Sequence, residues 1–274
     1  MAKILKKEQL SNDVYRYVVE ASAIAKKRKA GQFIILRLDE NGERIPLTIV
    51  RSDADAGWVE LIVQAVGKTT KQMAAMNVGD NILDLVGPLG VPIHVEKKGT
   101  VVMIGGGVGI APLYSIALAN HEAGNKLITI LGARNKDLII LKNEMAAISD
   151  EFIIATDDGS EGMKGLVTDA LQQIIDRGED IKEVVAIGPL VMMKFVSLLT
   201  KKYSIPTTVS LNTIMIDGTG MCGGCRVTVG GQQRFPCVHG PEFDGHQVDF
   251  DNLLRRSKTY QKEEQHICQL KGVL

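Results

Sequence analysis

The sequence predicts an α/β plus β fold: an N-terminal antiparallel β-barrel, a parallel five-stranded α/β domain, and a small C-terminal domain that holds the cysteines. Three observations carry this prediction. Short β-like runs punctuated by Gly, Asn and Asp fill residues 1–98, apolar strands alternate with helical patterns over 99–208, and all four cysteines lie in 209–274. We take these three ranges as the domains.

The first range contains five β-like runs, which are VYRYVVE, GQFIILRL, PLTIV, WVELIVQAV and NILDLVGPLG. Short strands at regular spacing, with turn residues between them, are typical of an antiparallel barrel or sandwich. Taken alone, Pro46 in ERIPLTIV marks an edge strand, and VGKTT at 66–70 marks a turn into a short helix.

The second range alternates between strand and helix patterns. Its strands are VVMI, LITIL, FIIAT, EVVAIG and TTVSL, and its helical patterns are GIAPLYSIALANHEAG, DLIILKNEMAAI, GLVTDALQQIIDRG and PLVMMKFVSLLTKK. This alternation predicts βαβ units and a parallel sheet, whose ligands bind outside the carboxyl ends of the strands. The third range closes with FDNLLRRSKTYQKEEQHICQL, for which we expect a helix.

A glycine-rich turn follows the first parallel strand, in VVMIGGGVGIAP. Such a turn lets a pyrophosphate approach the backbone and meet the N-terminus of a helix. The G-x-G-x-x-G spacing is incomplete, because Ile110 occupies the third glycine position, so a tight turn without a ligand is the alternative. The candidate nucleotide-binding residues here are Gly105, Gly106, Gly107, Val108 and Gly109.

Two later strand ends should border the same crevice. TDDGS follows the third parallel strand and GP follows the fourth. Turn residues are common at strand ends, so the two acids either position a ribose or amide group or only shape a turn. The candidates at these ends are Asp157, Asp158, Gly159, Gly188 and Pro189.

Charge and hydropathy narrow the class of protein. Lys plus Arg and Asp plus Glu both count 32, so the net charge is zero, and we expect neither nucleic acid nor an anionic membrane as a partner. The first 20 residues lack the apolar run of a signal peptide, and no apolar stretch approaches the roughly 20 residues of a membrane span. We therefore expect a cytoplasmic protein with reduced cysteines.

The stretch DGTGMCGGC, residues 217–225, carries the most specific pattern in the chain. With the next cysteine it reads D-x4-C-x2-C-x11-C, which is the plant-type two-iron spacing with a carboxylate in the first ligand position. Glycine-rich loops allow backbone N–H groups to approach cluster sulfur atoms. We predict a [2Fe–2S] cluster whose metal ligands are Asp217, Cys222, Cys225 and Cys237.

Two other interpretations of the cysteines remain open. A structural zinc ion could use the three thiols together with His239, His266 or Cys268, although zinc favours paired C-x2-C knuckles and only one is present. A redox-active thiol pair is the second alternative, although nothing around it resembles a thioredoxin unit. Cys268 is most simply a lone thiol.

The order PLT, VGKTT, GGGVGIAP and GP…MM resembles the ferredoxin–NADP reductase superfamily over about residues 10 to 205. The resemblance implies an FAD-binding barrel, in which Thr48 hydrogen-bonds the flavin and VGKTT holds the pyrophosphate, followed by a Rossmann-like NAD(P)-binding domain. The FAD-binding residues that it implies are Arg44, Pro46, Leu47, Thr48, Ile62, Val63, Gln64, Gly67, Thr69 and Thr70.

One position departs from the superfamily pattern. Its arginine lies three residues before the Ser/Thr, and Ile45 occupies that place here, one residue after Arg44. A one-residue step along a strand turns the side chain to the other face. Arg44 therefore reaches a flavin only if Pro46 disturbs the strand, for instance as a bulge.

With the third range included, the chain is similar to the electron-transfer subunits of dihydroorotate dehydrogenase, sulfide dehydrogenase and their relatives. The acid-first ligand pattern, ERIPLTI and GPEFDGHQVDFDNL look most like the small subunits of NADH-dependent reduced ferredoxin:NADP oxidoreductases. This resemblance implies FAD, NAD(H) and a [2Fe–2S] cluster as cofactors, with no catalytic side chain, because the cofactors carry the chemistry.

The same resemblance implies a heterodimer with a larger flavin and iron–sulfur subunit, which links the chain to ferredoxin and to electron bifurcation. The alternatives are the electron-transfer subunit of dihydroorotate dehydrogenase or sulfide dehydrogenase, and a zinc-stapled nucleotide-binding module. The choice between NADH and NADPH stays open. Arg134 and Lys136 follow the second parallel strand, where a 2′-phosphate could bind, but exposed basic residues are common in loops and we interpret these two as a solvated face.

Overall fold

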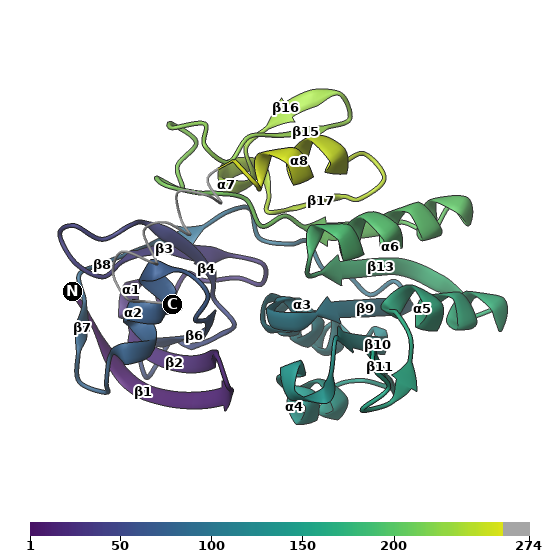
Figure 1. The fold of residues 1–274 in the computed structure, drawn as a ribbon, viewed down its shortest axis with the longest axis horizontal. Coiled ribbons are helices and arrows are strands. Elements are labelled where there is room, and N and C mark those ends of the chain that lie inside the picture. The colour runs from purple at the N-terminus through teal and green to yellow at the C-terminus, as the bar shows by residue number, and fades with distance from the viewer. Residues whose placement is uncertain (260–274) are drawn as a thin grey trace.

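The computed structural model describes residues 1–259, and these residues form three parts. Figure 1 shows the N-terminal part on the left, a helix-covered sheet on the right, and the third part above both. Among the described residues, no helix is long and apolar enough to cross a membrane.

The N-terminal part consists of two antiparallel sheets around one core, as the sequence predicts for a barrel. The larger sheet has the order β5-β6-β2-β1-β7 and the smaller one β4-β3-β8. The strands are β1 (Ala2–Ser11), β2 (Val14–Glu20), β3 (Phe33–Arg37), β4 (Ile45–Thr48), β5 (Arg51–Asp53), β6 (Trp58–Gln64), β7 (Asn81–Ile82) and β8 (Asp84–Leu89), with helices α1 (Ser22–Ala25) and α2 (Lys68–Ala75) between them.

The chain passes from the small sheet to the large one at a corner after β4. The Ile49 N–H donates to Gln32 O beside β3, whereas the next N–H, that of Val50, donates to Glu60 O on β6. Both side chains at this corner are buried. The barrel core therefore continues across the gap between the sheets.

The second part is a sheet of order β12-β11-β10-β9-β13-β14-β17. The five predicted strands form its parallel centre, and two short strands that the sequence does not predict extend its edges. The strands are β9 (Thr100–Gly106), β10 (Lys126–Ala133), β11 (Glu151–Thr156), β12 (Met163–Lys164), β13 (Ile181–Ile187), β14 (Thr207–Ser210) and the antiparallel β17 (Glu242–Asp244).

Helices cover both faces of this sheet. On one face, α3 (Ile110–Glu122) and α4 (Lys142–Ala147) share a core with barrel residues Val14, Val50 and Ile62. On the other, α5 (Val167–Asp176), α6 (Leu190–Lys202) and α8 (Phe250–Arg256) share a second core. α3 packs against the barrel, and the glycine turn that precedes it therefore lies beside β6.

The predicted helix over DLIILKNEMAAI is wrong in its first half. Only a 3-10 turn (η2, Lys136–Leu138) and the short α4 form, and Leu141 between them has a positive φ of 53°. Ile140 and Leu141 are buried in the core beneath α3. Tertiary burial of these two side chains therefore replaces the first helical turns with irregular backbone.

The third part is small and shares the sheet of the second. Its elements are the hairpin β15 (Val227–Val229) and β16 (Gln232–Arg234), the one-turn α7 (Pro236–His239), and β17 and α8. Residues 250–256 of the predicted C-terminal helix are helical, and residues 260–274, with His266 and Cys268, lie outside the described residues.

Candidate functional site

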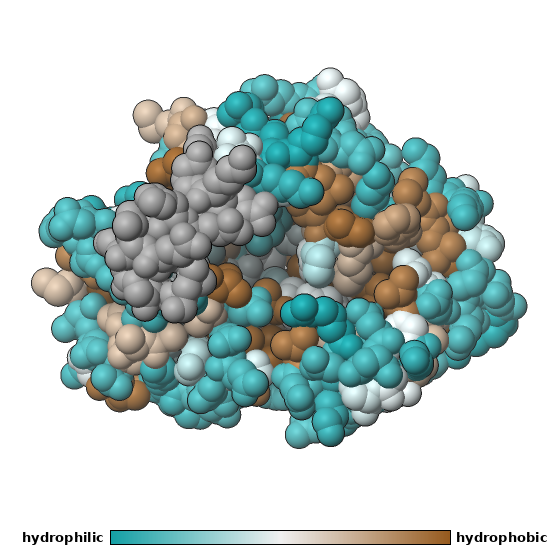
Figure 2. All heavy atoms as spheres, in the orientation of Figure 1, coloured by the Kyte–Doolittle hydropathy of each residue, from teal (hydrophilic) through white to brown (hydrophobic). Residues whose placement is uncertain are grey.

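A cavity of about 1530 Å³ lies where the three parts meet. Figure 2 shows a hollow near the middle of the molecule, with apolar side chains along its border. The volume exceeds the ~300–1,000 Å³ of an ordinary small-molecule pocket. The cavity therefore has room for more than one extended ligand.

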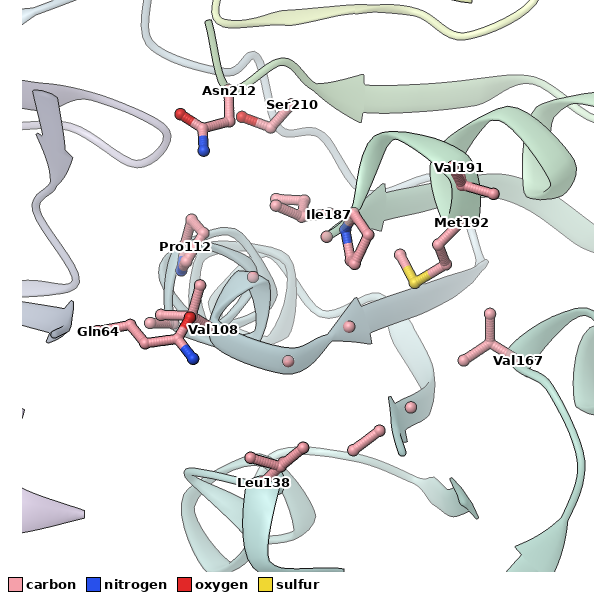
Figure 3. A pocket seen from close by; sticks show the side chains of 18 of the residues that line it. Gln64, Val108, Pro112, Leu138, Val167, Ile187, Val191, Met192, Ser210 and Asn212 are labelled. Carbon is pink, nitrogen blue, oxygen red and sulfur yellow. The ribbon is translucent and has the colours of Figure 1, made fainter. Parts of the chain in front are cut away.

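The barrel contributes β4 and β6 to the cavity wall. The β3–β4 pairing runs without a register shift, from Phe33 opposite Thr48 to Leu36 opposite Ile45. The predicted residues of these strands that line the cavity are Pro46, Leu47, Thr48, Ile62, Val63 and Gln64. Figure 3 shows the Gln64 amide reaching across to Val108 on the opposite wall.

The start of α2 forms one end of this wall. Thr70 lines the cavity, and its Oγ1 accepts hydrogen bonds from the N–H groups of Val66 (3.1 Å) and Gly67 (3.0 Å). Thr69 instead is buried and donates to Glu43 Oε2 at 2.7 Å, and neither Thr69 nor Gly67 lines the cavity. The free N–H groups and dipole of a helix start favour an anion here.

Arg44 lies outside the cavity. Its Nε donates to the backbone oxygen of Ile216 at 2.8 Å, so the side chain bridges the barrel and the cysteine loop. The unshifted pairing of β4 shows no bulge at Pro46 that would turn Arg44 inward.

The glycine turn after β9 forms the opposite wall, and Gly106, Gly107, Val108, Gly109, Gly188 and Pro189 all line the cavity. The turn is packed backbone to backbone: a Cβ added at Gly109 would lie 2.6 Å from Ile187 O, and one added at Gly188 would lie 3.0 Å from Gly106 Cα. Gly105 lies behind the turn, under Ile110 and Leu113. The glycines thus bring the ends of β9 and β13 together at one crevice.

The end of β11 places one predicted acid in the cavity. Asp157 lines it, and Asp158 and Gly159 do not. Hydrogen bonds from the Ser160 hydroxyl and N–H lower the pKa of Asp158. An aspartate that accepts the N–H two residues along the chain is common in turns. Arg134 also lines the cavity, whereas Lys136 does not.

Sequence reasoning missed a third group of cavity residues. They come from the start of α5, one face of α6, the end of β14 with the segment after it, and the residue before β17. They include Val167, Asp169, Val191, Met192, Phe195, Leu198, Ser210, Asn212, Met215 and Pro241. Figure 3 shows several of them around the cavity. Apolar residues at helical spacing on α6 were a detectable signal, but periodicity does not separate a core face from a cavity face.

Three of the four predicted metal ligands, Asp217, Cys222 and Cys225, lie in the loop beside this cavity, and the fourth, Cys237, lies on α7. Cys225 and Cys237 are buried with their sulfur atoms 3.4 Å apart, and Cys222 is exposed and accepts the Gly224 N–H at 3.5 Å. The Asp217 carboxylate accepts the N–H groups of Thr219 (2.9 Å) and Cys222 (2.8 Å). The loop gathers these side chains because Gly218, Gly220 and Gly223 take positive φ.

The protonation of these groups follows from their surroundings. Backbone N–H donors lower the pKa of Asp217, beginning with that of Thr219, so the carboxylate is ionised at neutral pH. Burial, together with the adjacent Cys225, raises the pKa of the Cys237 thiol to about 12. Metal binding must therefore displace a proton from Cys237.

The donor set suits a two-iron cluster. A [2Fe–2S] cluster distributes four ligands over two irons. Two adjacent buried thiols, an exposed thiol with an N–H on its sulfur and an ionised carboxylate match that distribution.

One small core joins the cysteine loop to the cavity. It consists of Phe33, Ile35, Met215, Cys225 and Cys237. Phe33 and Met215 also line the cavity. These two buried side chains therefore lie between the ligand space and the buried thiols.

Three domain families match the chain in the order of its three parts. They are the oxidoreductase FAD-binding domain at residues 1–92, the oxidoreductase NAD-binding domain at 103–198, and the iron–sulfur cluster binding domain of dihydroorotate dehydrogenase B at 212–249.

The chain is also similar to proteins along nearly its whole length. It is 49% identical to a dihydroorotate dehydrogenase B (NAD(+)) electron transfer subunit homolog of Thermotoga maritima, over 96% of this chain and 92% of that protein. It is 31% identical to the dihydroorotate dehydrogenase B (NAD(+)) electron transfer subunit of Streptococcus pneumoniae R6, over 88% of this chain and 94% of that protein. A solved structure of an NADH-dependent reduced ferredoxin-NADP oxidoreductase matches 100% of this chain and 98% of its own, with a TM-score of 0.95 and 46% identity.

Proposed function

Since the chain belongs to the family of dihydroorotate dehydrogenase B electron-transfer subunits and their homologues, we propose that it is an oxidoreductase subunit that passes electrons between NAD(H), FAD and a [2Fe–2S] cluster. The observation that carries the proposal is that one small hydrophobic core contacts both the cavity and the buried thiols. Phe33 and Met215 contact the cavity on one side and pack with Cys225 and Cys237 on the other. We propose that residues 1–98 form the FAD-binding domain, residues 99–208 the NAD(P)-binding domain, and residues 209–274 the [2Fe–2S]-binding domain.

Each wall of the cavity takes one role in this proposal. Thr48, Gln64 and the start of α2 hold the FAD, and the turns at Gly106–Gly109 and Gly188–Pro189 hold the nicotinamide dinucleotide. The flavin, when bound, exchanges electrons in pairs with the nicotinamide and singly with the cluster. The protein side chains position these groups and exclude water.

We propose that the chain works beside a larger subunit with a further flavin and iron–sulfur clusters, which connects it to ferredoxin. The support is the 46% identity over the full chain to the ferredoxin-NADP oxidoreductase structure, which was studied for flavin-based electron bifurcation. Purification of the native protein with its partner tests this proposal. A co-purifying flavin and iron–sulfur subunit with ferredoxin:NADP activity supports it, and a dihydroorotate-oxidising partner would select the second candidate function instead.

That second candidate is the electron-transfer subunit of a dihydroorotate dehydrogenase, which the names of the Thermotoga and Streptococcus relatives favour. The zinc-stapled module has no such support, since residues 212–249 match an iron–sulfur family. In both redox candidates we place the chain in the cytoplasm, where its thiols stay reduced.

Exchanging the first ligand tests the assignment of Asp217. Asp217→Cys is expected to keep a two-iron cluster and to shift its reduction potential by at least about 50 mV, since ligand exchange at one iron separates cluster types by hundreds of millivolts. Electron paramagnetic resonance with a redox titration measures the shift. Thr219→Ala, two residues away, is the control and should leave both unchanged, because Thr219 meets the carboxylate through its backbone N–H. An unaltered spectrum and potential in Asp217→Cys would remove Asp217 from the ligand set.

Flavin retention tests the barrel wall. Thr48→Ala is expected to release FAD more readily than Arg44→Ala, because Thr48 lines the cavity and Arg44 bonds to Ile216 outside it. Loss of one neutral hydrogen bond costs about 1 kcal/mol, which is roughly a fivefold weaker affinity. FAD remaining after dialysis decides the order, and faster loss from Arg44→Ala would show that the arginine is the flavin ligand.

A further inference from the structure

A half-buried glutamate, Glu242, stands behind the cavity without a role in the function proposed above. Glu242 lies on β17 opposite Ser210 of β14. Its Oε1 accepts the Ser210 hydroxyl at 3.0 Å, and its Oε2 is buried with no hydrogen-bond partner. A buried carboxylate oxygen without a donor is unfavourable unless the group carries a proton or serves a function.

The surroundings of Glu242 contain no compensating charge. The turn before β3 presents Gly31, on which an added Cβ would lie 3.0 Å from Oε2, and the segment after β8 presents Ile93 beside the same position. β14 presents only the Ser210 hydroxyl, and no charged side chain of the described residues contributes to the shift. Burial therefore raises the pKa of Glu242 to about 8.

Ser210 connects this carboxyl group to the cavity. Ser210 and Asn212 both line the cavity, and Figure 3 shows their polar ends close together at its upper wall. The bond between Ser210 and Glu242 runs in the direction that moves a proton away from the cavity, because the hydroxyl donates and the carboxylate accepts.

The proposed transfer of electrons from NADH to the cluster leaves a proton on the flavin. NADH gives up a hydride, which is one proton and two electrons, whereas an iron–sulfur cluster accepts only electrons, one at a time. When the two electrons pass through the cluster to a one-electron acceptor, one proton for each NADH must leave the flavin. A group near the cavity that binds and releases a proton at neutral pH is suited to this step.

We propose that Ser210 and Glu242 form the proton relay for flavin reoxidation. Ser210 Oγ would take the proton that bound flavin loses while the Ser210 O–H proton passes to Oε1 of the ionised Glu242. Glu242 is half-buried and would then release that proton to solvent, which returns it to the ionised state. The reverse steps would serve flavin reduction by one-electron donors. The relay rests on the function proposed above, because it presupposes that FAD occupies the cavity.

The pH dependence of flavin reoxidation tests the relay. The intact protein is reduced with NADH without oxygen and mixed with ferricyanide, and flavin absorbance is followed on either side of pH 8. The wild-type rate is expected to rise through about pH 8, because only the ionised Glu242 accepts a proton. In Glu242→Gln and Ser210→Ala the rise should vanish, with rates at alkaline pH lowered on the order of a hundredfold.

Asp244→Asn is the matched control, since Asp244 lies two residues away on the same strand and is exposed. FAD and iron content are measured in every variant. Wild-type protein without FAD or iron would refute the proposed function, whereas full cofactor content with an unchanged pH profile in both relay variants would overturn the relay alone.

Thermal stability gives a second readout that needs no turnover. The pKa of Glu242 is raised from 4.5 to about 8 in the folded protein, so the folded state binds more protons than the unfolded state between these values. The stability that this proton contributes is complete below pH 4.5 and is lost as pH rises through about 8. Glu242→Gln should lack this loss, and equal pH dependence in the two proteins would contradict a protonated Glu242.

Discussion

Replacing Cys225 with alanine is expected to lower the iron content from about two atoms per chain to nearly none, while FAD stays bound. Cys225 is buried, and its sulfur lies 3.4 Å from that of Cys237. The variant keeps only two thiols and one carboxylate of the proposed ligand set, so one of the two irons has one protein ligand instead of two. Iron, acid-labile sulfide and the visible spectrum, each expressed per FAD, measure the loss.

Two further variants separate ligation from packing. Cys225 belongs to the small core with Phe33 and Met215, so its truncation also affects packing. Cys222→Ala removes an exposed ligand without altering that core and should lose the cluster as well. Met221→Ala, at an exposed position of the same loop, should retain it. Iron that persists in both cysteine variants, or about one zinc per chain in the wild type, would contradict the cluster assignment.

The parallel sheet could be predicted because its signals are local. Each of its five central strands is a short apolar run bounded by turn residues. Such runs are typical of parallel strands that are buried on both faces, so they can be recognised in the sequence. The edge strands β12 and β17 have two and three residues, too short for any periodicity. β1 carries four charged residues among its ten, and its alternation of buried and exposed residues is confined to its start, at Ala2 and Ile4.

Local patterns alone predict the cavity at the turns that follow the parallel strands, whereas its barrel residues could be predicted only through the family resemblance. The residues from Gly106 to Gly109 lie together because they are neighbours in the chain. The bond from Arg44 to Ile216 spans 172 residues, and its existence depends on how the cysteine loop packs against the barrel. The same holds for Ser210 and Glu242, which lie 32 residues apart and meet because β17 pairs with β14. No local pattern encodes these contacts.

The glycine turn offers the second large effect. Gly109→Ala is expected to destabilise the protein by about 1–3 kcal/mol and to weaken NADH binding at least about tenfold. The added Cβ would lie 2.6 Å from Ile187 O and 2.7 Å from Gly188 Cα, which are backbone atoms that cannot rotate away. The ends of β9 and β13 must then separate, and they are the two sides of the nucleotide crevice.

Gly107→Ala is the comparison that identifies the cause. A Cβ at Gly107 meets nothing within 4 Å, so its cost in stability is limited to the positive φ of 55°, about 1 kcal/mol. Gly107 lines the cavity, and its substitution should therefore weaken NADH binding with a smaller loss of stability. Thermal unfolding and NADH titration of both variants measure the two effects. If Gly109→Ala is as stable as Gly107→Ala, backbone contact does not explain the glycine at 109, and if neither variant binds NADH more weakly, the dinucleotide does not bind at this turn.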